Sequence, residues 1–200
     1  MWSFNRERDA SKIDVKEIEW LGPFSWIGYE NQNNLEKMPD LEGIYLMTFQ
    51  YKDGYLVGGA GITKSTKSRF KRHTTEFKSG NYTVLNVMSA EKGERDEIWH
   101  GWQYARTHRE EFIERKEEIL KSVDEHLKSY RIFIAKISEK RIRERFEAAI
   151  MYYIYCCKEP WAEVADRGMF LNGRHNFEMP IKIKNISKYD FFGLPETLEI

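Results

Sequence analysis

Two basic side chains stand four residues apart at Arg69 and His73, in a segment, 66–78, that is predicted to be helical. Residues four apart lie on the same face of an α-helix. A guanidinium can bind a phosphate and offset charge in a transition state, and a histidine one turn away can hydrogen-bond the phosphate or move a proton. The pair therefore suits cleavage of a phosphodiester. The alternative is a surface helix that ends in basic residues.

A tyrosine hairpin precedes this helix. Residues 43–51 and 55–60 are predicted strands, and the Asp-Gly pair at 53–54 indicates the turn between them. Tyr45 lies on the first strand, and small residues at the end of the second strand leave space beside it. A tyrosine with a pKa of about 10 is a poor base at neutral pH unless cations such as Arg69 and a metal ion lower that pKa. The alternative for Tyr45 is a packing role, which most strand tyrosines have.

A carboxylate, Glu147, lies at the border of the apolar stripe of a helix that is predicted to begin at an N-cap, Ser138, and to end near Cys157. A carboxylate in such a position requires a partner. Either a basic neighbour on the same helix, Arg143 or Lys140, fills that role, or a divalent cation does. A carboxylate oxygen suits Mg²⁺, which keeps most of its waters and also contacts a substrate phosphate.

In order and spacing, these segments resemble the GIY-YIG nuclease family over residues 41–172. The matching segments are Gly43-Ile44-Tyr45 for the first signature, Leu56-Val57-Gly58 for the second, Arg69 and His73 for the catalytic helix, Phe146-Glu147-Ala148-Ala149-Ile150-Met151 for the glutamate helix that binds metal, and Pro160-Trp161 for the turn after it.

The resemblance implies a metal-dependent endonuclease that hydrolyses phosphodiester bonds in DNA, with RNA as an alternative substrate and a restriction-like or defence role. It implies that Glu147 binds Mg²⁺ or Mn²⁺ and that Arg69 stabilises negative charge. Tyr45, with Tyr55 or His73, would position or activate water. Since one such site cuts one strand, double-strand cleavage requires a homodimer or two successive nicks.

The second signature departs from the family pattern, because Leu56 stands where the family has a tyrosine. Tyr55 is one position earlier, and a shift of one residue on a strand moves a side chain to the other face. We expect a bulge near residues 58–59 to return Tyr55 to the site.

Two later positions also differ. Ala162 stands where many family members have an asparagine, and we expect Asn172 to take that role, the alternative being a turn formed with Gly173. Tyr82 stands where some homing enzymes have a further active-site histidine.

A cluster of cations lies on and beside the basic helix, although the formal net charge of the chain is 0. A local patch can contact phosphates even when the whole chain is neutral. The residues expected to contact DNA are Lys64, Lys67, Lys71, Arg72 and, later in the chain, Arg174. The alternative is a solvated helix face.

The predicted elements indicate an α+β fold, with a small central three-stranded antiparallel sheet flanked by helices. Residues 1–40 would form an N-terminal lead-in packed on the core, and 41–200 a single GIY-YIG-like catalytic domain with a helical insertion at about 81–129. The remaining predicted elements are a short strand at 82–88, one charged helix at 103–129, a central strand at 130–137 and an edge strand at 180–186.

No apolar run approaches the ~20 residues of a membrane span. We therefore expect no membrane partner and a cytoplasmic location. Cys156 and Cys157 are expected to be reduced, buried thiols, and no Cys/His spacing suits zinc. His108 and His126, on the charged helix, are expected to be solvated.

Two other function classes stay open at this point. A non-cleaving nucleic-acid-binding module of the same fold would bind in a salt-sensitive manner without cutting. A protein-interaction domain would have no affinity for nucleic acid.

Overall fold

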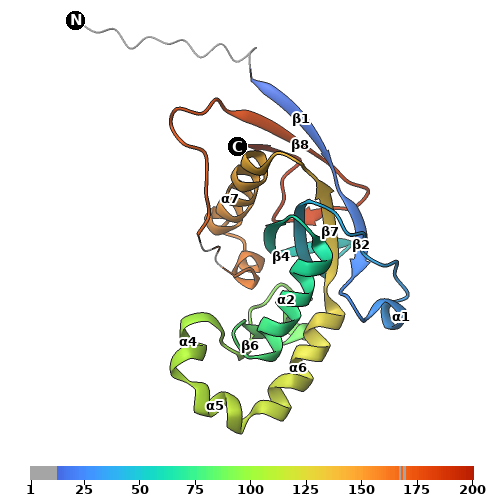
Figure 1. The fold of residues 1–200 in the computed structure, drawn as a ribbon, viewed down its shortest axis with the longest axis vertical. Helices are drawn as coiled ribbons and strands as arrows, with labels where there is room; N and C mark the ends of the chain where they lie inside the picture. Colours follow the sequence, from blue (N-terminus) through green and yellow to red (C-terminus); the bar gives the residue numbers. More distant parts are fainter. Residues whose placement is uncertain (1–12, 167, 169) are drawn as a thin grey trace, which may run out of the picture.

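The computed structural model describes residues 13–166, 168 and 170–200 of the 200-residue chain (Figure 1). It is a mixed α and β structure with helices and several sheets. The first twelve residues of the predicted lead-in lie outside the described residues.

The helices are α1 (Glu30–Asn33), α2 (Thr66–Lys78), α3 (Val87–Ala90), α4 (Trp102–Thr107), α5 (Arg109–Glu114), α6 (Lys116–Ser129) and α7 (Lys140–Cys156), with a 3₁₀ turn, η2 (Pro160–Val164). The strands are β1 (Asp14–Glu19), β2 (Leu21–Ser25), β3 (Gly43–Tyr51), β4 (Gly54–Thr63), β5 (Val84–Leu85), β6 (Glu97–Trp99), β7 (Arg131–Lys136), β8 (Ile181–Ile186), β9 (Phe191–Phe192) and β10 (Thr197–Glu199).

The central sheet has the strand order β2-β7-β3-β4-β9. The three strands expected from the sequence, β7, β3 and β4, pair antiparallel in its middle. β2 adds an antiparallel strand beside β7, and β9 adds a short parallel strand beside β4. The sheet therefore has five strands, because both the lead-in and the C-terminal segment contribute one.

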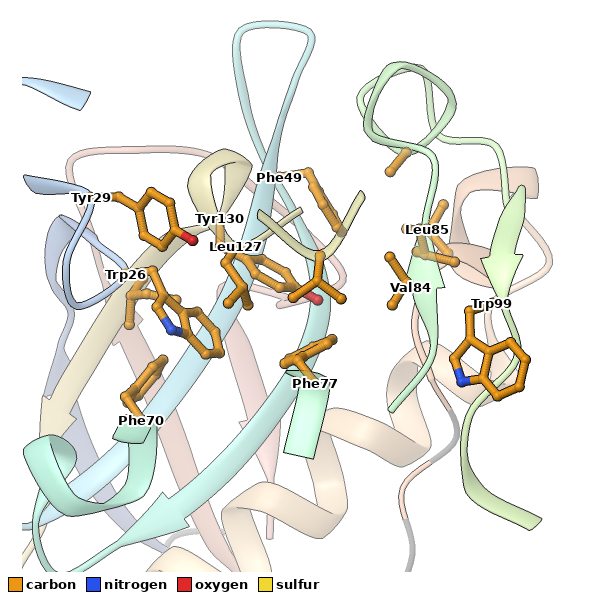
Figure 2. Packing of buried hydrophobic residues seen from close by; sticks show 14 of the residues in the cluster. Trp26, Tyr29, Phe49, Phe70, Phe77, Val84, Leu85, Trp99, Leu127 and Tyr130 are labelled. Atoms are coloured by element: carbon orange, nitrogen blue, oxygen red, sulfur yellow. The ribbon is translucent and has the colours of Figure 1, made fainter. Parts of the chain in front are cut away.

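Buried side chains cover both faces of this sheet. On one face, Ile44 and Leu46 of β3 pack with residues of α7. On the other face, Tyr45 and Phe49 pack with α2, α6 and the segment between them. Figure 2 shows Phe49 in this cluster, with Phe77 of α2 and Leu127 of α6. Because β3 is buried on both sides, it reads as a nearly continuous apolar run rather than as an alternating one.

Helix α2 has the bounds that the sequence predicts. Its N-cap, Ser65, accepts a hydrogen bond from the Ser68 amide, and the helix is followed by Gly80 in a left-handed conformation with φ of 75°. The helix buries Phe70 and Phe77 against Trp26, whose ring centroid lies 4.8 Å from that of Phe70 (Figure 2). This packing fixes which face of α2 points toward β3.

The predicted charged helix at 103–129 is wrong as a single element. The chain leaves helical geometry at His108 and at Arg115, so α4, α5 and α6 form an arc at the bottom of Figure 1. One straight helix of this length would extend about 40 Å. The two breaks let Phe112 and the stripe of α6 reach the same core.

His126 is buried, with 1% of its surface exposed, so its predicted solvation is wrong. It lies on the stripe that includes Ile119 and Val123, at the spacing of one helix face. Its Nδ1 accepts a hydrogen bond of 3.2 Å from the amide of Leu85. The charge of the surrounding residues concealed this position in the sequence.

A second sheet has the order β1-β8-β10. The predicted edge strand at 180–186 corresponds to β8, but it is the middle strand of this sheet, because β1 pairs with it in parallel and β10 pairs with it antiparallel. The predicted N-cap at Ser138 is also wrong, since α7 begins after Glu139, whose side chain makes no capping hydrogen bond.

The predicted short strand at 82–88 is reduced to the two residues of β5, and α3 follows at once. Both cysteines are free, as predicted. Their predicted burial is wrong, because Cys156 is exposed and Cys157 is half-buried at the end of α7. No helix among the described residues is both long and apolar enough to cross a membrane.

Candidate active site

A cavity of about 350 Å³ opens beside the middle of β3 and β4. Its lining comes from β3, β4, α2, α7, the segment between α2 and β7, and described residues that follow α7. The polar side chains that line it are Tyr45, Arg69, His73, Tyr82, Thr83, Trp102, His126, Tyr130, Glu147 and Asp166. We refer to it as the central cavity.

The Tyr45 hydroxyl is held by two residues of α2. Arg69 donates a hydrogen bond from Nε to the Tyr45 oxygen at 2.9 Å, and His73 Nε2 lies 2.7 Å from the same oxygen. The structure thus brings together the tyrosine and both helix residues that the sequence singles out. Tyr45 is 1% exposed and His73 is 4% exposed, so these bonds are sheltered from bulk water.

The directions of these hydrogen bonds follow from the donors. The guanidinium of Arg69 can only donate, so the Tyr45 hydroxyl accepts from it. His73 Nε2 is the other polar contact of this hydroxyl among the described residues, and the buried hydroxyl hydrogen is satisfied by donation to that nitrogen. His73 then carries its proton on Nδ1, which lies 3.2 Å from the hydroxyl oxygen of Tyr82. A chain of hydrogen bonds therefore runs from Arg69 through Tyr45 and His73 to Tyr82.

Burial controls the protonation of this chain. It raises the pKa of Tyr45 to about 12, and the charge of Arg69 only partly opposes it. Arg69 by itself therefore does not bring the pKa of Tyr45 below its ordinary value. Burial, followed by the charge of Arg69, lowers the pKa of His73 to about 3. Both residues are therefore neutral near pH 7.

Arg69 has two nitrogens to spare. Its recorded hydrogen bond uses Nε, and its terminal nitrogens have no hydrogen-bond or ion-pair partner in the part of the chain that the structure describes. The residue is half-buried and lines both the central cavity and an open groove of about 430 Å³. A forked donor in this position is free to bind a phosphate bidentately.

Gly61 makes room for the Tyr45 ring, and the sequence analysis did not identify it. It lies opposite Tyr45 across the β3–β4 ladder. A Cβ atom at this position would collide with the hydroxyl end of the Tyr45 ring. The run of small residues in β4 was the available signal, but only the strand register shows which of them faces the tyrosine.

We expect Gly61→Ala to displace the Tyr45 hydroxyl from Arg69 and His73, because the added methyl group occupies the place of the ring. The cost should be about 1–3 kcal/mol in the free energy of unfolding. Urea unfolding measures it, with Gly59→Ala as the control, since a Cβ there meets only the flexible end of Met47. Equal stability of both variants would contradict the close packing.

Glu147 reaches the cavity from α7. Its carboxylate accepts a hydrogen bond from the backbone amide of Ile62 on β4, and burial raises its pKa to about 7. One turn later on α7, Met151 Sδ lies 3.4 Å from the amide nitrogen of Ala60. Residues four apart on a helix and residues two apart on a strand are both separated by about 6 Å. Glu147 and Met151 of α7 can therefore lie beside the amides of Ile62 and Ala60 on β4 at the same time.

The two basic residues that could have neutralised Glu147 are engaged elsewhere. Arg143 forms an ion pair with Glu42 at 2.7 Å, and Lys140 forms one with Glu144 at 3.2 Å. Glu147 has no ion-pair partner among the described residues, although the charge of Arg69 acts on it across the cavity. A half-buried carboxylate without an ion-pair partner leaves a position for a cation.

This single carboxylate fits Mg²⁺ in chemistry. Within the described ranges, no group of three or more His, Cys, Asp or Glu side chains is placed to hold a metal ion. Mg²⁺ commonly binds through one or two carboxylates, several waters and substrate phosphates. Glu147 is therefore the residue that would hold the ion.

Tyr55 lies on the opposite face of the sheet. The expected bulge exists, since Met47 pairs with Gly59 while Thr48 pairs with Val57, which leaves Gly58 unpaired. The bulge has the reverse of the expected effect, because it moves Tyr55 away from the face of the sheet that carries Tyr45. Without the extra residue, the two tyrosines would lie on the same face. The Tyr55 ring instead packs against Phe133 and Tyr189. Leu56 lies on the Tyr45 face and is fully buried.

Asn172 and Arg174 are also outside the central cavity. Asn172 is exposed and donates from Nδ2 to Glu144 at 3.0 Å. Arg174 forms an ion pair with Glu199 at 3.5 Å. Neither lines the cavity, because the C-terminal segment carries them beside the first turns of α7.

The predicted cations on and beside α2 are exposed. Lys64, Lys67, Lys71 and Arg72 are all in this class. Lys64 and Arg72 line the open groove, which Arg69 also lines. Arg69 therefore connects the groove with the central cavity, as a path for a phosphate backbone would require.

Two buried neutral histidines should make the protein sensitive to acid. The pKa of His73 and of His126 is about 3 in the folded state, because burial lowers both from 6.5. The unfolded chain therefore binds protons below pH 6.5 that the folded chain does not, and stability falls as the pH decreases. We expect a loss of about 2 kcal/mol per histidine at pH 5.

Glu147 acts in the opposite direction, since its raised pKa favours the protonated folded state below pH 7. The histidine effect should therefore be measured in Glu147→Gln, by urea unfolding at pH 7 and pH 5. Adding His126→Phe should remove about half of the loss. An unchanged pH dependence would show that His126 titrates normally.

Comparisons with models of known protein families, with curated proteins and with solved structures gave no significant match to this chain.

Proposed function

We propose that this protein is a metal-dependent endonuclease of the GIY-YIG type that hydrolyses phosphodiester bonds in DNA. The observation that carries the proposal is the constellation in the central cavity. The Tyr45 hydroxyl is held by Arg69 and His73, and it shares a cavity with a half-buried carboxylate, Glu147, that has no ion-pair partner among the described residues. The antiparallel arrangement of β7, β3 and β4 supports the same family.

Tyr45 has one lone pair left to orient a water molecule. Its hydrogen points to His73, and one lone pair accepts from Arg69, so the remaining lone pair can accept a hydrogen bond from the attacking water. As the water attacks phosphorus in line, the proton that it loses moves toward Tyr45 and His73. The bond between phosphorus and the leaving oxygen then breaks, and that oxygen takes up a proton from the solvent.

Arg69 stabilises the charge that develops on the phosphate. Its terminal nitrogens bind the non-bridging oxygens while Nε keeps Tyr45 in place. A divalent cation held by Glu147 would polarise the phosphate and neutralise part of its charge. The exposed cations along the groove position the strand without reading its sequence.

The experiment that tests the proposal is incubation of the purified protein with supercoiled plasmid and with genomic DNA, in Mg²⁺ or Mn²⁺ and in EDTA. Nicked or linear products that require the metal support it. Since the cavity has one Tyr45–Glu147 set, nicks should precede linear products unless two chains act together. Intact DNA under all metal conditions would contradict it.

A non-cleaving nucleic-acid-binding module is the second candidate. The position of the family's second tyrosine is occupied by Leu56, which is buried in the core, and Tyr55 faces away. Binding that weakens with salt, together with intact substrate, would favour this function.

A further inference from the structure

The central cavity extends beyond the residues of the proposed reaction. Part of its lining is contributed by the segment between α2 and β7, through Tyr82, Thr83, Trp102, His126 and Tyr130. The proposed chemistry uses neither Trp102 nor His126. Its volume of about 350 Å³ lies at the lower end of the range for small-molecule sites.

Trp102 is held in a strained and well-anchored position. Its backbone has φ of 57°, which non-glycine residues rarely adopt. Its amide donates to the Asn81 carbonyl at 2.8 Å, and its indole Nε1 donates to Asp166 at 3.1 Å. Asp166 is in turn held by Arg95 at 2.7 Å. Strain that the surroundings enforce in this way clusters at functional sites.

One face of the Trp102 ring packs on Tyr82, with ring centroids 4.9 Å apart and planes 34° apart. Tyr82 is the one aromatic ring recorded against Trp102 in the described part of the chain. Trp102 is half-buried and lines the cavity. The Tyr82–Trp102 pair thus forms an aromatic platform, and the Tyr82 hydroxyl of this platform is hydrogen-bonded to His73.

His126 adds a buried polar atom without a partner. Its Nδ1 accepts the Leu85 amide, so the proton of this neutral histidine resides on Nε2. Nε2 has no hydrogen-bond partner among the described residues, and the residue is 1% exposed. His126 lines the cavity, and an unsatisfied donor favours a ligand with an acceptor.

We propose that the part of the central cavity lined by Trp102 and His126 binds an unstacked nucleobase of the strand that is cut. The ring of the base would stack on the Trp102 indole. The inference rests on the proposed nuclease function. A planar base has the π-face that an aromatic platform binds and the ring nitrogens and carbonyls that accept from His126. A base next to the scissile phosphate is also tethered beside Arg69 and Tyr45. The substrate class is therefore DNA with a mismatched, bulged or single-stranded nucleotide at the cut, because extruding such a base costs least.

The test compares cleavage of a paired duplex with cleavage of the same duplex carrying one mismatch beside the cut. The proteins are the wild type, Trp102→Ala, Trp102→Phe and Trp161→Ala. Trp161 is a matched control, since it is a half-buried tryptophan that does not line the cavity. Circular dichroism and thermal unfolding establish that each variant is folded.

We expect the wild type to cut the mismatched duplex faster than the paired one. Trp102→Ala should lose roughly 5- to 150-fold on the mismatched duplex, as expected for one base–aromatic stack. Trp102→Phe should retain most of the preference, and Trp161→Ala should behave as the wild type. Equal cleavage of both duplexes by the wild type, or a folded Trp102→Ala that keeps the preference, would overturn the base site.

A binding measurement separates this inference from the proposed function. Oligonucleotides with 2-aminopurine at successive positions report stacking by fluorescence quenching, and EDTA prevents metal-dependent cleavage. Quenching at one position that Trp102→Ala removes supports the base site even in a protein that does not cut. Uniform fluorescence in a protein that cuts plasmid would refute the base site and leave the nuclease in place.

Discussion

Arg69→Ala is expected to lower the rate of DNA cleavage by about 10²- to 10³-fold, as the loss of one preorganised charge-stabilising group does in other enzymes. Two effects combine in this variant. The phosphate loses its forked donor, and the Tyr45 hydroxyl loses the 2.9 Å bond that fixes its orientation. Arg69→Lys should restore little of the activity, since an ammonium cannot bond Tyr45 and grip a phosphate bidentately at once.

The matched control for Arg69 is Arg72→Ala. Arg72 lies on the same helix and lines the groove, but it does not line the central cavity. Its loss should weaken binding to all sequences and reduce the salt dependence by about one counterion, with little change in kcat. Initial rates over a range of substrate concentrations separate the two outcomes. Similar kcat values for both variants would remove Arg69 from the reaction.

Glu147→Gln is expected to abolish metal-dependent cleavage and yet to stabilise the metal-free protein above pH 7. The folded-state pKa is about 7 against 4.5 for an ordinary glutamate, because the carboxylate is buried. The contribution of protonated Glu147 to the free energy of unfolding is therefore fully present below pH 4.5, and it is lost as the pH rises through 7. Removing the charge should add on the order of 2–3 kcal/mol at pH 8 and nothing at pH 4.

Without metal at pH 8, Glu147→Gln should be more stable than the wild type, and added Mg²⁺ should make the wild type the more stable of the two. The ion raises the Tm of the folded wild type by binding to it, and it has no carboxylate to bind in Glu147→Gln. Thermal unfolding at pH 8 with and without Mg²⁺ measures both effects. Glu144→Gln is the control, since Glu144 lies one turn earlier on α7 and is paired with Lys140 and Arg141. Partial burial opposes but does not outweigh these cations, which lower the pKa of Glu144. A Mg²⁺ shift that persists in Glu147→Gln would place the metal elsewhere.

The local elements around the site could be predicted from the amino-acid sequence. The Asp-Gly pair between two apolar runs correctly predicted the β3–β4 hairpin, and α2 has the predicted bounds. The turn signal is local, because a turn joins residues only a few positions apart. For the same reason the four-residue spacing correctly placed Arg69 and His73 on one helix face, and both reach the Tyr45 hydroxyl.

Which groups share the cavity depends on contacts between distant parts of the chain, and the sequence could not predict it. One unpaired residue, Gly58, moves Tyr55 to the other face of the sheet, and strand alternation cannot show which register a bulge selects. Tyr82, Trp102 and His126 reach the cavity because the segment after α2 folds back on the core, and their contacts depend on partners distant in the sequence. Glu147 lacks a cation because Arg143 pairs with Glu42, which lies about a hundred residues earlier. Long-range pairing of this kind depends on the assembled core, and no local pattern encodes it.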